Sequence, residues 1–188
     1  ELGRRIRDEA ALEVCDRAIA SGVGVLSEEY DMQWFPGDDL LAAARPRGLP
    51  IGNLTSQFWA NVYLNDFDHF VKQELKCRGY VRYVDDFLLF GDDKAQLWGW
   101  RSAIIDYLAG LRLRLHEDRA QATPVTSGIP FLGFRVYPTH RRLKRRNGVN
   151  FQRRFKGLVL ALARREIGLE QLHTATRGWI NHARYGDT

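Results

Sequence analysis

Two short apolar runs joined by a pair of aspartates constrain the fold of this chain more than any other feature. Residues 80–84 and 87–91 are rich in aromatic, leucine and valine side chains, and only Asp85 and Asp86 lie between them. Apolar runs of this length with so short a connection are typical of an antiparallel β-hairpin. We therefore expect a hairpin whose tip carries two adjacent carboxylates.

Helices are predicted on both sides of this hairpin. Apolar residues recur at steps of three and four in residues 55–76, which predicts one long amphipathic helix. The same periodicity predicts further helices over residues 2–21, 93–109, 150–166 and 169–184. A short helical turn is expected to start at Asp38.

Strand and turn signals occupy the intervening segments. Leucine alternates with arginine in residues 111–115, which predicts a strand with one buried face. Residues 131–137 are predicted to form another strand, and the basic segment 141–146 is expected to end at a hairpin-type turn, Asn147-Gly148. This order of elements predicts an α+β fold with an antiparallel sheet and a helical appendix.

The formal net charge of +5 divides unequally along the chain. Residues 135–188 hold 13 lysines and arginines against 3 acidic residues, a net charge of +10, so residues 1–134 carry −5. Clustered basic residues attract polyanions such as nucleic acids. The alternative is a solvated surface that keeps the protein in solution.

Composition bears on the class of protein. Apolar residues make up 45% of the chain, enough for a hydrophobic core, and no apolar run approaches the roughly 18 residues of a membrane span. Cys15 and Cys77 lack the spacing of a zinc site or a disulfide framework. We expect a cytoplasmic protein without a membrane partner, and a piece of a longer one, because the chain begins within a helix-like segment at Glu1.

Three Asp-Asp pairs can be compared with one another. The pairs at residues 38–39 and 92–93 each follow a glycine and precede a helix-like segment, so we interpret them as helix N-caps. Asp85-Asp86 stands between two strands, where no helix end would neutralise it. Solvated turn residues are one interpretation. The other is a divalent-cation site, because Mg²⁺ prefers carboxylate oxygens and takes the rest of its shell from water and phosphates.

Four segments, in order, resemble motifs of the reverse transcriptases. Tyr83-Val84-Asp85-Asp86 resembles the YxDD box, and Ile51 to Gln57 resembles the loop-to-helix motif beneath the incoming nucleotide. Residues 128–134 resemble the primer-grip strand, and residues 178–188 resemble the thumb helix of bacterial retroelement enzymes. The IGxxxSQ form of the second motif is similar to the enzymes of diversity-generating retroelements, which copy RNA with errors at adenines. The resemblance covers residues 48–188.

This resemblance implies a role for each matching residue. Asp85 would be the direct metal ligand and Asp86 a supporting one, with Mg²⁺ or Mn²⁺ as the ion. Substrate-binding positions are Ile51, Gly52, Asn53, Ser56, Gln57, Tyr83 and Arg119. Nucleic-acid-binding positions are Leu132, Gly133, Arg141, Arg142, Lys144, Arg145, Arg146, Arg153, Arg154 and Lys156. The implied partners are an RNA template, a DNA primer, deoxynucleoside triphosphates and an accessory protein.

The resemblance also implies a division into a palm, residues 1–137, and a basic hairpin with a helical thumb, residues 138–188. Two departures from the family pattern stand out. The D-x-x-x-F-[FY] motif that carries a further metal-binding aspartate has no match, since Asp31 lies too close to Gly52, and the fingers are missing with it. Arg119 stands where the family tends to have lysine, so we interpret it as a phosphate clamp, because arginine is a poor proton donor. The alternative function is nucleic-acid or structured-RNA binding, as in group II intron maturases, without polymerase activity.

Overall fold

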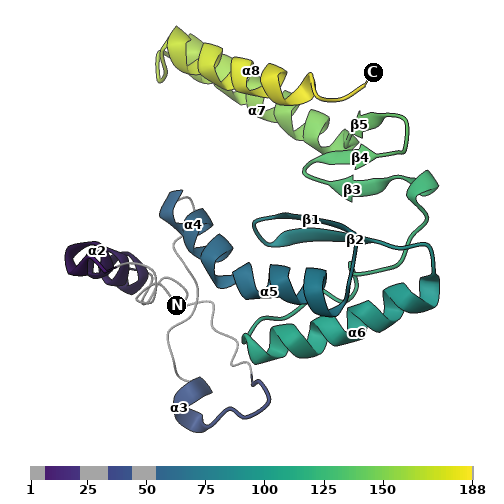
Figure 1. Ribbon diagram of the computed structural model, residues 1–188. Helices are drawn as coiled ribbons and strands as arrows, with labels where there is room; N and C mark the ends of the chain where they lie inside the picture. Colours follow the sequence, from purple (N-terminus) through teal and green to yellow (C-terminus); the bar gives the residue numbers. More distant parts are fainter. Residues whose placement is uncertain (1–6, 22–33, 44–53, 188) are drawn as a thin grey trace. The chain divides into compact units, whose positions relative to one another are not determined.

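The computed structural model of the chain describes residues 7–21, 34–43 and 54–187, which form two compact units, residues 1–121 and 122–188 (Figure 1). The fold is α+β, as expected. The boundary between the units precedes the one expected after Tyr137, because β3, β4 and β5 form one sheet that belongs to the second unit. Ile51, Gly52 and Asn53 lie outside the described residues. No helix among the described residues is long and apolar enough to cross a membrane.

The first unit surrounds a two-stranded hairpin with helices. In chain order its elements are α2 (Glu9–Ala20), α3 (Leu40–Ala43), α4 (Leu54–Tyr63), α5 (Asn65–His69), the π-helix η1 (Phe70–Glu74), β1 (Gly79–Tyr83), β2 (Asp86–Phe90) and α6 (Lys94–Gly110). The side chain of Asp93 accepts hydrogen bonds from the first turn of α6, as predicted. The carboxylate of Asp38 accepts the Phe35 N–H and pairs with Arg112, and a cap on α3 from Asp39 stays a prediction.

The segment predicted as one helix over residues 55–76 is divided in the structure. A turn at Leu64 separates α4 from α5, and α5 passes into the wider π-helical turn, closed by a Leu75 N–H bond to the Phe70 carbonyl of 3.1 Å. The predicted apolar face is nevertheless the buried one, with Phe67 and Val71 fully inaccessible to solvent. The apolar periodicity predicts which face of a helix is buried, but it does not predict where the helix is interrupted or changes to a π-helix.

The core of the first unit holds the hairpin against α5 and α6. It is built from Leu64, Phe67, Val71, Cys77, Ile104 and Leu108. The ring of Phe67 lies at its centre, with centroid distances of 6.3 Å to Tyr80 and 5.1 Å to Phe87 from the hairpin. One face of the hairpin is therefore packed against this core.

The strand predicted for residues 111–115 does not form. A turn at Leu111-Arg112, where Arg112 has φ +57°, ends α6, and residues 113–116 have no strand partner in the described part of the chain. Leu111, Leu113 and Leu115 still pack against the core. The alternation thus marked a buried face correctly, but burial alone does not supply a neighbouring strand.

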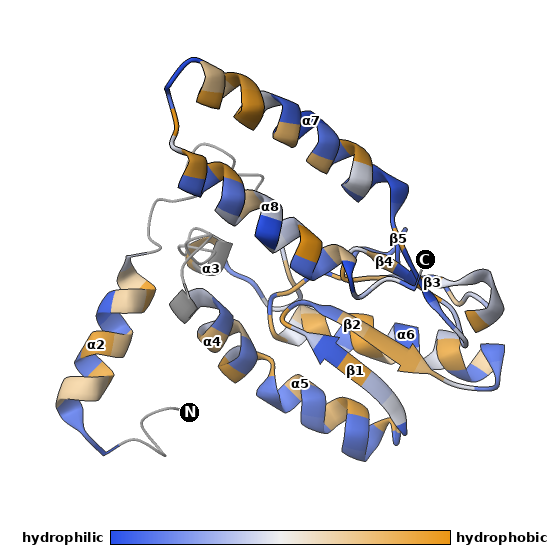
Figure 2. Cartoon of the chain, turned by 90° about the horizontal axis from the view of Figure 1, so that it is seen from above, coloured by the Kyte–Doolittle hydropathy of each residue, from blue (hydrophilic) through white to orange (hydrophobic). Residues whose placement is uncertain are grey.

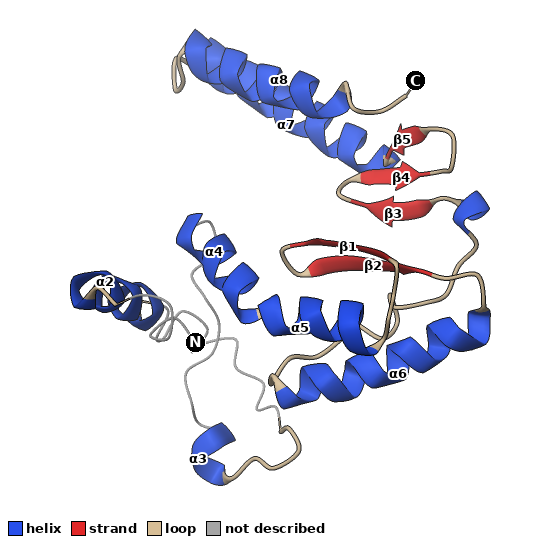
Figure 3. Ribbon diagram, viewed as in Figure 1, coloured by secondary structure: helices blue, strands red, loops and turns tan. Residues whose placement is uncertain are grey.

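The second unit combines a small sheet with two helices (Figure 3). Its elements are η2 (Val125–Ser127), β3 (Ile129–Phe131), β4 (Phe134–Val136), β5 (Arg141–Leu143), α7 (Arg145–Ala163) and α8 (Leu169–Ala183). The three strands are antiparallel in the order β3-β4-β5. The rings of Phe151 in α7 and Trp179 in α8 stack 4.5 Å apart, which joins the two helices.

Two sequence predictions in this unit were wrong. The strand expected over residues 131–137 is interrupted at Leu132-Gly133, where φ angles of +44° and +87° make a tight turn between β3 and β4. Asn147 and Gly148 lie inside α7 instead of a hairpin turn. Asn147 is held there because its side chain donates to the Gly133 carbonyl, so a contact distant in sequence outweighs the local turn preference.

Candidate metal-binding and nucleic-acid-binding residues

The tip of the β1-β2 hairpin is a two-residue turn, Val84-Asp85. Tyr83 and Asp86 form the last pair of the ladder, so Asp85 lies in the turn and Asp86 begins β2. Val84 has φ +55°, a conformation that is unfavourable for a β-branched residue. Such backbone persists only where the surroundings enforce it, and it is frequent at functional sites.

The surroundings of this turn are dominated by Arg82. Its side chain is 10% exposed and binds both oxygens of Asp68, through Nε at 2.7 Å and Nη2 at 2.5 Å. Nη1 donates to the Val84 carbonyl at 2.8 Å and to Asn61 Oδ1 at 2.8 Å. The turn is thereby tied to α5 through Asp68 and to α4 through Asn61.

The charge of Asp68 is stabilised by its neighbours. Burial opposes ionisation, but the hydrogen bonds from Arg82 and from the Tyr80 hydroxyl, at 2.7 Å, hold the pKa of the Asp68 carboxyl below its usual value. Burial and the bond to Asp68 raise the pKa of Tyr80, and the bond to Asp68 raises the pKa of Arg82. Asp68 is therefore an anion that anchors Arg82. Both of its oxygens are bonded to Arg82, so we do not assign it to the candidate metal site.

Asp85 and Asp86 have the opposite character. Both are exposed, and neither carboxylate has a hydrogen bond or ion pair with another described residue. Two free carboxylates fit a magnesium ion that takes its other ligands from water and phosphate. Across residues 7–21, 34–43 and 54–187 no group of three or more His, Cys, Asp or Glu side chains is arranged to hold a metal, so Asp85 and Asp86 would supply only part of a metal's ligand shell.

The other residues expected to contact substrate are spread over three elements. Ser56 is half-buried and Gln57 exposed in the first turns of α4, the helix whose Asn61 reaches Arg82. Tyr83, at the end of β1, is 53% exposed. Arg119 is exposed in the turn after α6, which Arg101 fastens by bonds to the Ala120 carbonyl and Glu117.

In the second unit the Leu132-Gly133 turn is bonded to the start of α7 and lies close to His182 of α8. The Gly133 carbonyl accepts hydrogen bonds from the Lys144 N–H at 3.0 Å and from Asn147 Nδ2 at 3.1 Å. A Cβ on Gly133 would lie 2.7 Å from Asn147 Nδ2 and 3.2 Å from His182 Nε2. The two segments that resemble the primer grip and the thumb helix therefore meet at this turn.

The end of the chain packs along β5. The Arg141 N–H donates to Asp187 Oδ2, and the Asp187 N–H donates to the Arg141 carbonyl, both at 2.7 Å. The Arg141 side chain also lies near Asp187, with Nε 3.8 Å from the carboxylate. Arg142 lies over the Tyr137 ring, 5.7 Å from its centroid. Lys144 is half-buried and contributes its backbone N–H, as described above.

The remaining predicted basic residues lie on α7. Successive residues of an α-helix turn by about 100°, which places Arg145, Arg146, Arg153 and Lys156 on one face, opposite the Phe151 and Phe155 rings, and Arg154 at its side. All five are exposed. Hydrophilic and hydrophobic patches alternate along α7 in Figure 2. This basic face, defined by Arg145, Arg146, Arg153 and Lys156, is available to a polyanion.

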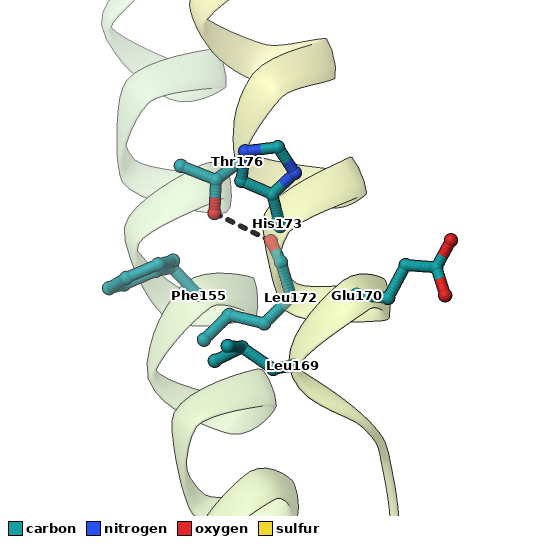
Figure 4. A pocket seen from close by; sticks show the side chains of 6 residues that line it. All are labelled: Phe155, Leu169, Glu170, Leu172, His173 and Thr176. Atoms are coloured by element: carbon teal, nitrogen blue, oxygen red, sulfur yellow. Dashed lines mark hydrogen bonds between the residues drawn. The ribbon is translucent and has the colours of Figure 1, made fainter.

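An open, mostly apolar depression lies between α7 and α8, lined by Phe155, Leu169, Glu170, Leu172, His173 and Thr176 (Figure 4). The Thr176 hydroxyl donates to the Leu172 carbonyl of its own helix at 2.8 Å. The lining contains no residue expected from the sequence to bind substrate or nucleic acid.

Five important residues escaped the sequence analysis: Asn61, Asp68, Arg82, Asn147 and His182. Arg82 could have been identified from the sequence. It lies two residues after Tyr80, on the same packed face of the hairpin, where a positive charge needs an acidic partner. Asn147 and His182 could not have been identified, since their importance depends on contact with Gly133.

Comparisons with known proteins give a limited similarity. No protein-family model matches the chain. Protein YkfC of Escherichia coli (strain K12) is 29% identical over 129 residues, in an alignment that covers 51% of this chain and 34% of YkfC. The chain thus spans about a third of the length of this relative, and its function has to be inferred from its own residues.

Proposed function

We propose that this chain is the palm and thumb part of an RNA-directed DNA polymerase, a bacterial retroelement reverse transcriptase closest to the diversity-generating type. One observation carries the proposal: Asp85 lies on the two-residue hairpin turn and Asp86 directly follows it at the start of β2, and both carboxylates are exposed and without a side-chain partner among the described residues. The order of the four resembling segments supports the same assignment.

The metal-binding role falls to the hairpin tip. Asp85 would hold Mg²⁺ or Mn²⁺, with Asp86 in support and a further aspartate supplied by the D-x-x-x-F-[FY] motif of the intact enzyme. When bound, the ion supplies Lewis-acid assistance to a primer 3′-hydroxyl and offsets charge on the departing pyrophosphate. Tyr83 would contact the primer end from the exposed end of β1, and Arg119 would hold nucleotide phosphate.

The second unit would hold the primer and template. The basic face of α7 neutralises backbone phosphates without reading sequence, because lysine and arginine contacts to phosphate carry no base information. The Leu132-Gly133 turn, bonded to Lys144 and Asn147, offers a rigid edge beside the primer. The opposed charges of the two halves of the sequence agree with this division.

RNA-templated primer extension with Mg²⁺ tests the proposal. We expect the 188-residue chain alone to give no extension, and a longer protein that adds the D-x-x-x-F-[FY] segment to give extension that Asp85→Ala abolishes. Extension by the chain alone would contradict the need for the added aspartate. Failure of the longer protein to extend any primer would contradict the polymerase assignment.

A second function, nucleic-acid binding without polymerisation, is favoured by the exposed basic face of α7 together with the partial metal shell at the hairpin. It predicts RNA binding that survives Asp85→Ala and falls with Arg153→Gln, and no extension in any context. Measuring binding and extension on the same variants separates the two functions.

A further inference from the structure

The turn that carries Asp85 needs support from outside its own strands. A two-stranded hairpin is marginally stable by itself, and its tip is the part with the fewest neighbours. Val84 adds a positive φ of +55°, which a valine avoids in a relaxed chain. Something must therefore hold this backbone in place for the two carboxylates to have one fixed arrangement.

Arg82 is placed to give that support. Three of its nitrogens donate at 2.5 to 2.8 Å, to Asp68, Asn61 and the Val84 carbonyl. Its guanidinium is a planar fork, so the two bonds to Asp68 fix the direction in which Nη1 points. Nη1 therefore points at the carbonyl of Val84, the residue with the positive φ.

The simpler alternative is that Arg82 only neutralises Asp68 in a partly buried ion pair. The bonds to Asp68 and Asn61 would satisfy that role by themselves. The bond to the Val84 carbonyl is the additional one, and it connects the ion pair to the residue directly before Asp85. Arg82 lies on the packed face with Tyr80, whereas Asp86 begins β2 on the opposite, exposed face, so Arg82 acts from behind the candidate metal site.

We infer that Arg82 is a positioning residue: anchored on Asp68, it holds the Val84 carbonyl and thereby fixes the turn that presents Asp85 and Asp86 to a divalent cation. The effect on the cation rests on the proposed function, whereas the effect on the turn does not. Arg82 itself touches neither metal nor substrate.

Arg82→Lys is the decisive variant, because lysine keeps the charge but has one nitrogen and cannot bridge Asp68, Asn61 and Val84 together. Arg101→Lys is the matched control. Arg101 is also partly buried, at 23% exposed, and makes an ion pair of 2.9 Å with Glu117, but it has no bond to the hairpin. Asp68→Asn is the second, milder variant in case Arg82→Lys does not fold.

The test uses NMR relaxation of the backbone and Mn²⁺ titration of the whole chain. In the wild type we expect rigid amides at residues 84–86, with order parameters of about 0.85, and selective broadening of the same signals by Mn²⁺. Arg82→Lys should lower the order parameters below about 0.6. It should also weaken Mn²⁺ binding about tenfold, the usual order of loss when a residue that orients metal ligands is removed. Asp68→Asn should shift both in the same direction, and Arg101→Lys should leave both unchanged.

The inference is overturned if Arg82→Lys, or Asp68→Asn where Arg82→Lys does not fold, leaves the turn as rigid as in the wild type. It is also overturned if Arg101→Lys loosens the turn as much. If the turn loosens in Arg82→Lys but the wild type binds no Mn²⁺, the positioning of the turn stands and the metal-binding part of the proposed function fails. The two failures are therefore distinguishable.

Discussion

Replacing Gly133 with alanine should destabilise the second unit more than the same substitution at an exposed glycine would. The residue has φ +87°, where an L-amino acid costs roughly 1–2 kcal/mol. The new Cβ would lie 2.7 Å from Asn147 Nδ2, so Asn147 must withdraw and give up its bond to the Gly133 carbonyl. A lost hydrogen bond of this kind costs about 1 kcal/mol net. The expected destabilisation is therefore about 2–3 kcal/mol.

Native-state hydrogen exchange at the Lys144 N–H reports this change locally, because that amide donates to the Gly133 carbonyl. A loss of about 2–3 kcal/mol corresponds to roughly 30- to 150-fold faster exchange. Gly157→Ala is the control: it lies within α7 with open space around its Cβ position, and it should slow exchange through a gain of about 0.5–1 kcal/mol. The reasoning is refuted if Gly133→Ala leaves exchange at Lys144 unchanged or matches Gly157→Ala.

Three further predictions concern pH, salt and fidelity. Because the pKa of Asp68 is lowered in the folded chain, its ion pair stabilises the fold above the ordinary carboxyl pKa and is lost as the pH falls below about 4; Asp68→Asn should flatten the acid limb of stability measured by urea unfolding. Each phosphate contact removed from α7, as in Arg146→Gln or Arg153→Gln, should reduce the slope of log affinity for single-stranded RNA against log salt by about 0.7. Ile51→Gln in an active polymerase should reduce misincorporation at template adenines, measured by sequencing the products.

Each of these has an outcome that contradicts it. An unchanged acid limb in Asp68→Asn would mean that the ion pair does not couple to protonation. The exposed Arg17 of α2 provides the control for salt dependence, and an equal loss of slope in Arg17→Gln would remove the special role of α7. The reason for the third prediction is that isoleucine lacks the amide that could hydrogen-bond beside the nascent base pair, so an unaltered error spectrum in Ile51→Gln would contradict it.

The sequence was sufficient for the elements that depend on local pattern. The hairpin around Asp85, the helix capped by Asp93 and the two C-terminal helices were predicted, because apolar periodicity and capping chemistry act over a few residues. Leu111 and its neighbours were assigned the correct buried face. Their strand was wrong because a strand needs a partner, which no local pattern supplies.

The sequence was sufficient to select the candidate metal-binding carboxylates, but it did not predict the residues that hold their turn in place. Asp85 could be selected among three acidic pairs, since only its pair lacked a helix to cap. The bond from Arg82 to Val84 and the clamp of Asn147 on Gly133 could not, because each joins residues whose relation is set by packing. The turn at Leu132-Gly133 was missed for the same reason. The apolar run predicts one continuous strand, and the two positive φ angles that interrupt it are not evident from the sequence.

The central claim is that Asp85 is a metal-binding carboxylate of a polymerase site. Its most direct test is the single-turnover rate of RNA-templated primer extension by the protein that carries this chain together with the D-x-x-x-F-[FY] segment. Asp85→Asn should lower this rate by a factor on the order of 1,000 while RNA binding is unchanged, because a metal ligand contributes several kcal/mol to the transition state. Asp92→Asn, which removes an exposed carboxylate beside the α6 cap, should keep the wild-type rate. Equal rates for Asp85→Asn and Asp92→Asn would contradict the account.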